Sequence, residues 1–80
     1  METKVISLNG DTFRFELKYG NVSGHGFYHT CTLYRNGTQV ARDRVQYLNR
    51  TWEEYTFQTV MLRCARKIKN EELIAKLKIS

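Results

Sequence analysis

The sequence predicts an α+β fold, in which a four-stranded antiparallel sheet of two hairpins packs against one C-terminal helix, with a short second helix after it. Three observations indicate this. Apolar and polar residues alternate in several segments before residue 47. Asn-Gly pairs, which favour tight hairpin turns, separate these segments at two places. Beyond residue 51 the apolar spacing changes to the period of a helix. Eighty residues predict one domain, spanning residues 1–80.

The first hairpin is expected from residues 4–8 and 12–19. The second segment alternates without a break, which is typical of a strand with one buried face. Its apolar positions are Phe13, Phe15, Leu17 and Tyr19. Asn9-Gly10 favours a two-residue turn, which places Ile6 opposite Phe13 on the core face.

The second hairpin is expected from residues 27–35 and 38–45, joined by Asn36-Gly37. The polar residues 20–26, with three glycines, predict a loop before it.

The alternation of the fourth strand changes phase along its length. A two-residue turn pairs Leu33 with Val40, and Val45 and Tyr47 are then out of phase with Val40. We expect a bulge or a sharp bend near Arg42 to restore the core face.

The helix is expected to begin at a capping box, Thr51 with Glu54, with Asn49 as a second candidate cap. Acidic residues in its first turn and basic residues in its last turns suit the helix dipole. Asn70 predicts the start of a short second helix that ends near residue 77. The apolar stripe that should face the sheet consists of Phe57, Val60, Met61, Cys64 and Ile68.

The composition favours an anionic partner and a reducing compartment. The net charge is +5, which suits nucleic acid or an acidic protein surface. The apolar runs are too short to cross a bilayer, and the N-terminus lacks the layout of a signal peptide, so we expect a cytoplasmic protein with no membrane partner. Cys31 and Cys64 are interpreted as core thiols, and a disulfide between them is left open.

Residues that could support chemistry are few. His25, His29 and Cys31 form the one metal-like cluster, but their spacing supplies no second ligand pair. Cys31 beside His29 is the best candidate nucleophile, and both are expected to face the interior, where a thiol is inert. The sequence therefore predicts a protein that is not an enzyme and has no metal and no cofactor.

Two surfaces remain as candidate binding sites. The first is the outer side of the helix, with Trp52, Tyr55, Arg63 and Arg66. Aromatic and arginine side chains of this kind are common hot spots of protein interfaces. The alternative, that Trp52 and Tyr55 fold back to close the core, stays open.

The second surface is the sheet face that the helix leaves open. Tyr28 and Tyr34 share this face of one strand, with Thr30 and Thr32 between them, and Arg14 and Lys18 of a neighbouring strand can join them. Aromatic and basic residues on an open sheet bind bases and phosphates in some RNA-binding modules. Ordinary cross-strand packing of Tyr and Thr is the alternative.

Residues 47–60 contain Asn-Arg-Thr-Trp-Glu, then two aromatics spaced by two, then a small polar residue before an aliphatic one. This segment resembles one found in small proteins of phages and other mobile elements. The resemblance implies a non-enzymatic accessory protein that binds and modulates or inhibits a host protein or ribonucleoprotein complex in the host cytoplasm, such as an anti-CRISPR inhibitor. The basic charge departs from the acidic DNA mimics among such proteins. A small RNA- or DNA-binding module is the alternative function, and the sequence does not determine the oligomeric state.

Overall fold

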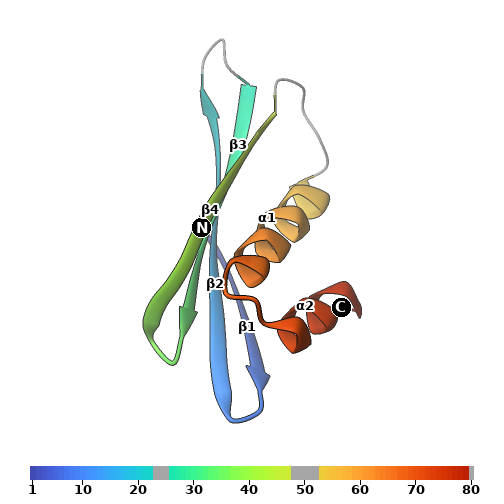
Figure 1. Ribbon diagram of the computed structural model, residues 1–80. Coiled ribbons are helices and arrows are strands. Elements are labelled where there is room, and N and C mark those ends of the chain that lie inside the picture. Colours follow the sequence, from blue (N-terminus) through green and yellow to red (C-terminus); the bar gives the residue numbers. More distant parts are fainter. Residues whose placement is uncertain (23–25, 48–52, 80) are drawn as a thin grey trace.

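The computed structural model describes residues 1–22, 26–47 and 53–79; within these ranges the side chains of residues 22, 47 and 53–56 are not described. The described residues form one antiparallel sheet of strand order β1-β2-β3-β4, and both helices cover the same face of it (Figure 1). This confirms the predicted α+β architecture. The elements are β1 (Glu2–Leu8), β2 (Asp11–Val22), β3 (Gly26–Arg35), β4 (Thr38–Tyr47), α1 (Glu53–Lys67) and α2 (Glu71–Ile79).

Both hairpin turns have the backbone that their Asn-Gly pairs predict. Asn9 and Gly10 have φ angles of 51° and 83°, and Asn36 and Gly37 have φ angles of 51° and 85°. Two successive residues at positive φ are typical of a type I′ turn, which matches the right-handed twist of the strands it joins. The first turn fixes the register of its hairpin as expected, since Ile6 pairs with the first core phenylalanine of β2, Phe13.

The predicted loop over residues 20–26 is wrong at both ends, because β2 continues to Val22 and β3 begins at Gly26. Gly20 pairs with Tyr28 inside the ladder. A side-chain carbon built on Gly20 would lie 2.2 Å from Cζ of Tyr28, so the end of the ring lies directly over the glycine. An aromatic side chain that covers a cross-strand glycine offsets the weakness of glycine in a strand.

A β-bulge interrupts the second hairpin two residues before the expected position. Leu33 pairs with Ala41 and Tyr34 pairs with Gln39, so Val40 is the extra residue. The expected pairing of Leu33 with Val40 is therefore wrong, although the need for a bulge is confirmed.

The bulge determines which side chains of β4 face the helices. Ala41 and Val45 pack on the core, and Asp43 is bonded to a helix side chain. Arg42 and Arg44 consequently lie on the opposite face of the sheet, because successive side chains of a strand alternate.

The core lies between the sheet and the two helices. Four of the five residues in the predicted helix stripe are buried, and Ile68 is partly buried against them. The buried apolar residues are Phe13, Phe15, Leu17, Cys31, Leu33, Ala41, Phe57, Val60, Met61, Cys64, Ala65, Leu73 and Leu77. Cys31 and Cys64 are free thiols, and the Cys64 thiol donates to the Cys31 carbonyl oxygen at 3.5 Å.

Three residues, 68–70, join the two helices. The Asn70 backbone N–H donates to the Ala65 carbonyl at 3.3 Å and that of Lys69 donates to Arg66 at 3.0 Å, while Lys69 has a φ angle of 54°. This pattern is a Schellman motif with lysine at the position that usually holds glycine. Asn70 also caps α2, because its Oδ1 accepts from the Leu73 N–H at 3.0 Å.

Candidate functional site

The face of the sheet that points away from the helices gathers alternate side chains of β2, β3 and β4. Arg14 pairs with Tyr34 across β2 and β3, and Lys18 pairs with Thr30. Tyr28 lies on the same face of β3, six residues before Tyr34. The structure thus brings the four residues predicted for this surface, Arg14, Lys18, Tyr28 and Tyr34, onto one face. We call it the open face.

Each tyrosine of the open face is paired with an arginine. The Arg14 guanidinium carbon lies 4.3 Å from the centre of the Tyr34 ring, and that of Arg44 lies 4.3 Å from the centre of the Tyr28 ring. Arg14 is also held by Glu16, with Nη1 2.7 Å from Oε2. Arginine over an aromatic ring is a cation–π contact, in which the ring face attracts the positive charge.

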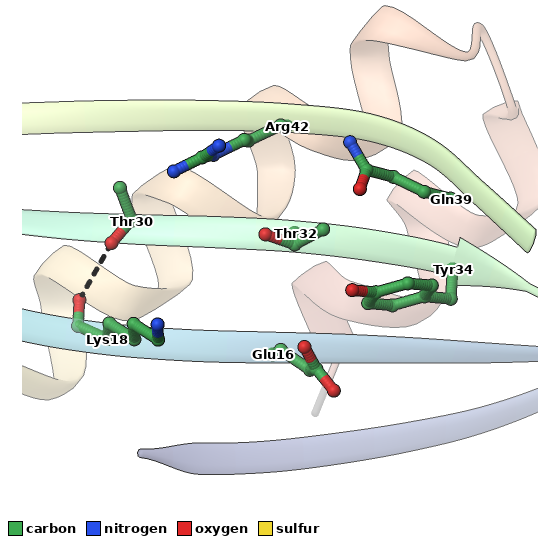
Figure 2. A pocket seen from close by; sticks show the side chains of 7 residues that line it. All are labelled: Glu16, Lys18, Thr30, Thr32, Tyr34, Gln39 and Arg42. Atoms are coloured by element: carbon green, nitrogen blue, oxygen red, sulfur yellow. Dashed lines mark hydrogen bonds between the residues drawn. The ribbon is translucent and has the colours of Figure 1, made fainter.

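A polar hollow of about 220 Å³ occupies the middle of the open face, between these two pairs. Figure 2 shows Lys18 of β2 and Arg42 of β4 on either side of the threonines of β3, and the Thr30 hydroxyl donates to the Lys18 carbonyl at 3.5 Å. The lining residues are Glu16, Lys18, Thr30, Thr32, Tyr34, Gln39 and Arg42.

The open face has more cations than carboxylates. In residues 1–22, 26–47 and 53–79, its one acidic side chain is Glu16, which is bonded to Arg14. Lys18, Arg42 and Arg44 are exposed, and none of them is ion-paired with another described residue. The Arg44 side chain reaches the neutral Gln46 amide oxygen at 3.5 Å. Lys18 and Arg42 therefore line the hollow, and Arg44 lies on the same face, each without a carboxylate partner among the described residues.

The structure gives less support to the predicted outer helix surface. Trp52 lies outside the described residues, and so does the side chain of Tyr55. Arg63 is turned to the sheet, where its Nε lies 2.7 Å from Oδ2 of Asp43. Arg66 is exposed on α1. Of the four predicted residues, only Arg63 and Arg66 thus have side chains that the structure describes, and Arg63 helps to hold α1 on β4.

Asp43 anchors the last turns of α1 to the edge strand β4. Its side chain is 12% exposed, and burial by itself would raise the pKa of the carboxyl. The hydrogen bonds from Arg63 and from the Arg44 backbone N–H, together with the charges of Arg63 and Lys67, outweigh burial and hold the pKa of Asp43 below its ordinary value. Lys67 adds a second tether, because its Nζ donates to the Arg42 carbonyl at 2.8 Å.

His29 is a core residue between two rings, the Tyr19 and Phe57 rings, whose centroids each lie 4.8 Å from that of the imidazole. It is 1% exposed. His25 lies outside the described residues. In the part of the chain that the structure describes, no three His, Cys, Asp or Glu side chains are arranged to hold a metal ion.

Cys31 faces the interior, as expected from its place on β3. Hydrogen bonding with the Cys64 thiol, together with burial, raises the pKa of Cys31 well above that of a free cysteine. The side chain is therefore a protonated thiol at neutral pH, and not the thiolate that acts as a nucleophile.

Two residues of the open face, Arg42 and Arg44, were not among those expected from the sequence. Regular alternation from Val40 places both on the helix side, and only the bulge reverses them. The change of phase at Val45 and Tyr47 is the signal that could have found them. It shows that one residue is extra, but it does not show which one.

Comparison of the chain with protein-family models, with curated proteins and with solved structures gave no match. No helix of the described residues has the length and apolar character needed to cross a bilayer.

Proposed function

We propose that this protein is a non-enzymatic binding domain that holds nucleic acid on the open face of its sheet. One observation carries the proposal: Lys18, Arg42 and Arg44, which lack carboxylate partners among the described residues, lie on the face that also presents Tyr28 and Tyr34. Uncompensated cations attract phosphates, and aromatic rings beside them stack on bases.

An acidic protein surface would satisfy the cations equally well, but it would leave the tyrosines without a role. Nucleic acid uses both, because each nucleotide offers a phosphate and a flat base. The outer helix surface is the weaker candidate, since Arg63 is engaged by Asp43.

The proposal is compatible with the role that the phage-like segment implies. A phage-type accessory protein that modulates a host ribonucleoprotein, such as an anti-CRISPR inhibitor, can act by binding the guide RNA or the bound DNA of that complex. We propose this cytoplasmic setting as the biological context of the open face.

The test is fluorescence anisotropy with a labelled oligonucleotide at a series of salt concentrations. If the three cations displace counterions from three phosphates, the plot of log affinity against log salt has a slope of about −2. Affinity then falls about 20-fold between roughly 50 and 200 mM salt. We expect the triple variant Lys18→Gln, Arg42→Gln, Arg44→Gln to flatten this slope while circular dichroism shows the same fold.

The matched control removes the same charge from the helices. Arg66, Lys76 and Lys78 are exposed on α1 and α2, and their replacement by glutamine should change affinity less than about threefold. An equal loss in both triple variants would overturn the open face as the site. Full competition by polyglutamate at equal charge would indicate an acidic protein partner instead.

A further inference from the structure

The two Arg–Tyr pairs lie at opposite ends of the hollow and face the same way. Tyr28 and Tyr34 are six residues apart on β3, a separation of roughly 20 Å at about 3.3 Å per strand residue. Lys18 and Arg42 lie between them, beside Thr30 and Thr32 (Figure 2). The order along β3 is therefore ring, cations with hydroxyls, ring.

Both pairs are held in position before any ligand arrives. The end of the Tyr28 ring lies directly over Gly20, so a side chain at residue 20 would displace the ring, and Arg44 covers the ring from β4. Arg14 is fixed by Glu16 as well as by the Tyr34 ring. In each pair the guanidinium carbon lies over the tyrosine ring, and both guanidinium planes and tyrosine rings stack on nucleobases.

On these grounds, and resting on the proposed function, we propose that the open face selects single-stranded nucleic acid. One base stacks on the Arg44–Tyr28 pair, another stacks on the Arg14–Tyr34 pair, and the phosphates between them lie beside Lys18 and Arg42. A duplex cannot use the two stacks, because its base faces are already occupied by neighbouring bases. A strand that crosses a span of roughly 20 Å needs about six nucleotides at the 3.4 Å rise of a stacked helix, and fewer when it is extended.

The first experiment compares four probes of about 12 nucleotides by fluorescence anisotropy: single-stranded RNA, single-stranded DNA and the duplex of each. We expect a single strand to bind at least about tenfold more tightly than its duplex, and the two single-stranded arms show whether the sugar matters. In a second series, affinity should rise steeply from three to about seven nucleotides and change little beyond, because a shorter strand cannot reach both stacks.

The second experiment separates stacking from charge. Tyr28→Leu and Tyr34→Leu should each lower single-strand affinity about tenfold or more and leave the salt slope unchanged. Arg42→Gln should instead make the slope shallower by about 0.7. Tyr19→Leu is the matched control, because Tyr19 is 40% exposed but stacks with Phe27 on the helix side of the sheet.

The outcomes are distinct for the two proposals. Equal affinity for duplex and single strand, or tyrosine variants within twofold of the wild type, would overturn single-strand selection and leave nucleic-acid binding intact. If none of the four probes binds at low salt, both proposals fail.

Discussion

The two faces of the sheet use charged side chains in opposite ways. On the helix side, Asp43 binds Arg63 at 2.7 Å and lies 4.0 Å from Lys67. At the end of the sheet, Asp11 binds Arg35 at 2.6 Å. On the open face, Glu16 is the one carboxylate among the described residues, and it binds Arg14. Three further cations of that face have no carboxylate partner among the described residues.

The carboxylates of the helix side have a structural consequence that the open face lacks. Hydrogen bonds from Asn36 and Arg35 lower the pKa of Asp11, and Asp11 thereby ties the two hairpin ends together. Asp43 ties α1 to β4. Arg35, Arg63 and Lys67 thus serve the fold, whereas Lys18, Arg42 and Arg44 have no ion pair among the described residues. This difference predicts that stability and binding can be changed separately.

The largest effect on stability should come from the buried residue of a neighbouring pair on β3 whose two side chains lie on opposite faces of the sheet. Leu33 is fully buried, so Leu33→Ala should lower the free energy of unfolding by about 2–5 kcal/mol. Thr32 lines the hollow, and Thr32→Ala should cost less than about 1 kcal/mol. Urea unfolding of both variants measures the difference, and similar costs would contradict the assignment of the two faces.

The second effect concerns the Asp43 anchor and depends on pH. Its carboxyl has a lowered pKa, so its contribution is present above the ordinary value of 3.8 and is lost as pH falls through the lowered one. Asp43→Asn should destabilise the protein by about 1–2 kcal/mol at neutral pH, and by progressively less below about pH 4. Denaturant unfolding at several pH values checks this. If the variant were still less stable than the wild type by the same amount at about pH 2, the role of the Asp43 charge would be contradicted. The nucleic-acid affinity of the variant should equal that of the wild type.

The third effect is a gain of stability at the junction of the two helices. Lys69 adopts a left-handed backbone at φ 54°, which costs about 1 kcal/mol for a residue with a side chain. Lys69→Gly should raise the free energy of unfolding by about 0.5–1 kcal/mol without changing binding. Lys69→Ala is the control, because it removes the charge and keeps the strain; thermal melts that rank it equal to the glycine variant would contradict this explanation.

The smallest effect on stability should accompany a clear effect on binding. Gly20→Ala places a methyl group where the Tyr28 ring lies, and the ring can move into solvent at a net cost below about 1 kcal/mol. Single-strand affinity should nevertheless fall about tenfold, as for Tyr28→Leu. In a double variant that combines Gly20→Ala with Tyr28→Leu, single-strand affinity should be no lower than in Tyr28→Leu alone. An additive loss of affinity would show that the glycine acts on binding by another route.

Local signals in the sequence were sufficient for most of the elements. The period-two pattern of β2, the Asn-Gly turns, the Asn70 cap and the apolar stripe of α1 each depend on a few neighbouring residues. They also placed Tyr28, Tyr34, Arg14 and Lys18 on one sheet face. The glycine-rich segment after Tyr19 was misjudged, because the ring that covers Gly20 comes from another strand.

The composition of the open face was decided by tertiary structure. The side chains of a strand alternate with a period of two, so one extra residue reverses every side chain that follows it. The sequence by itself required such a residue in β4, but not its position, because Val40 and Ala41 are both apolar. Packing selects the small Ala41 for the core opposite Leu33 and leaves Val40 at the bulge, 40% exposed. Because the bulge lies at Val40, Asp43 faces the helices and contacts Arg63, and Arg42 and Arg44 lie on the open face.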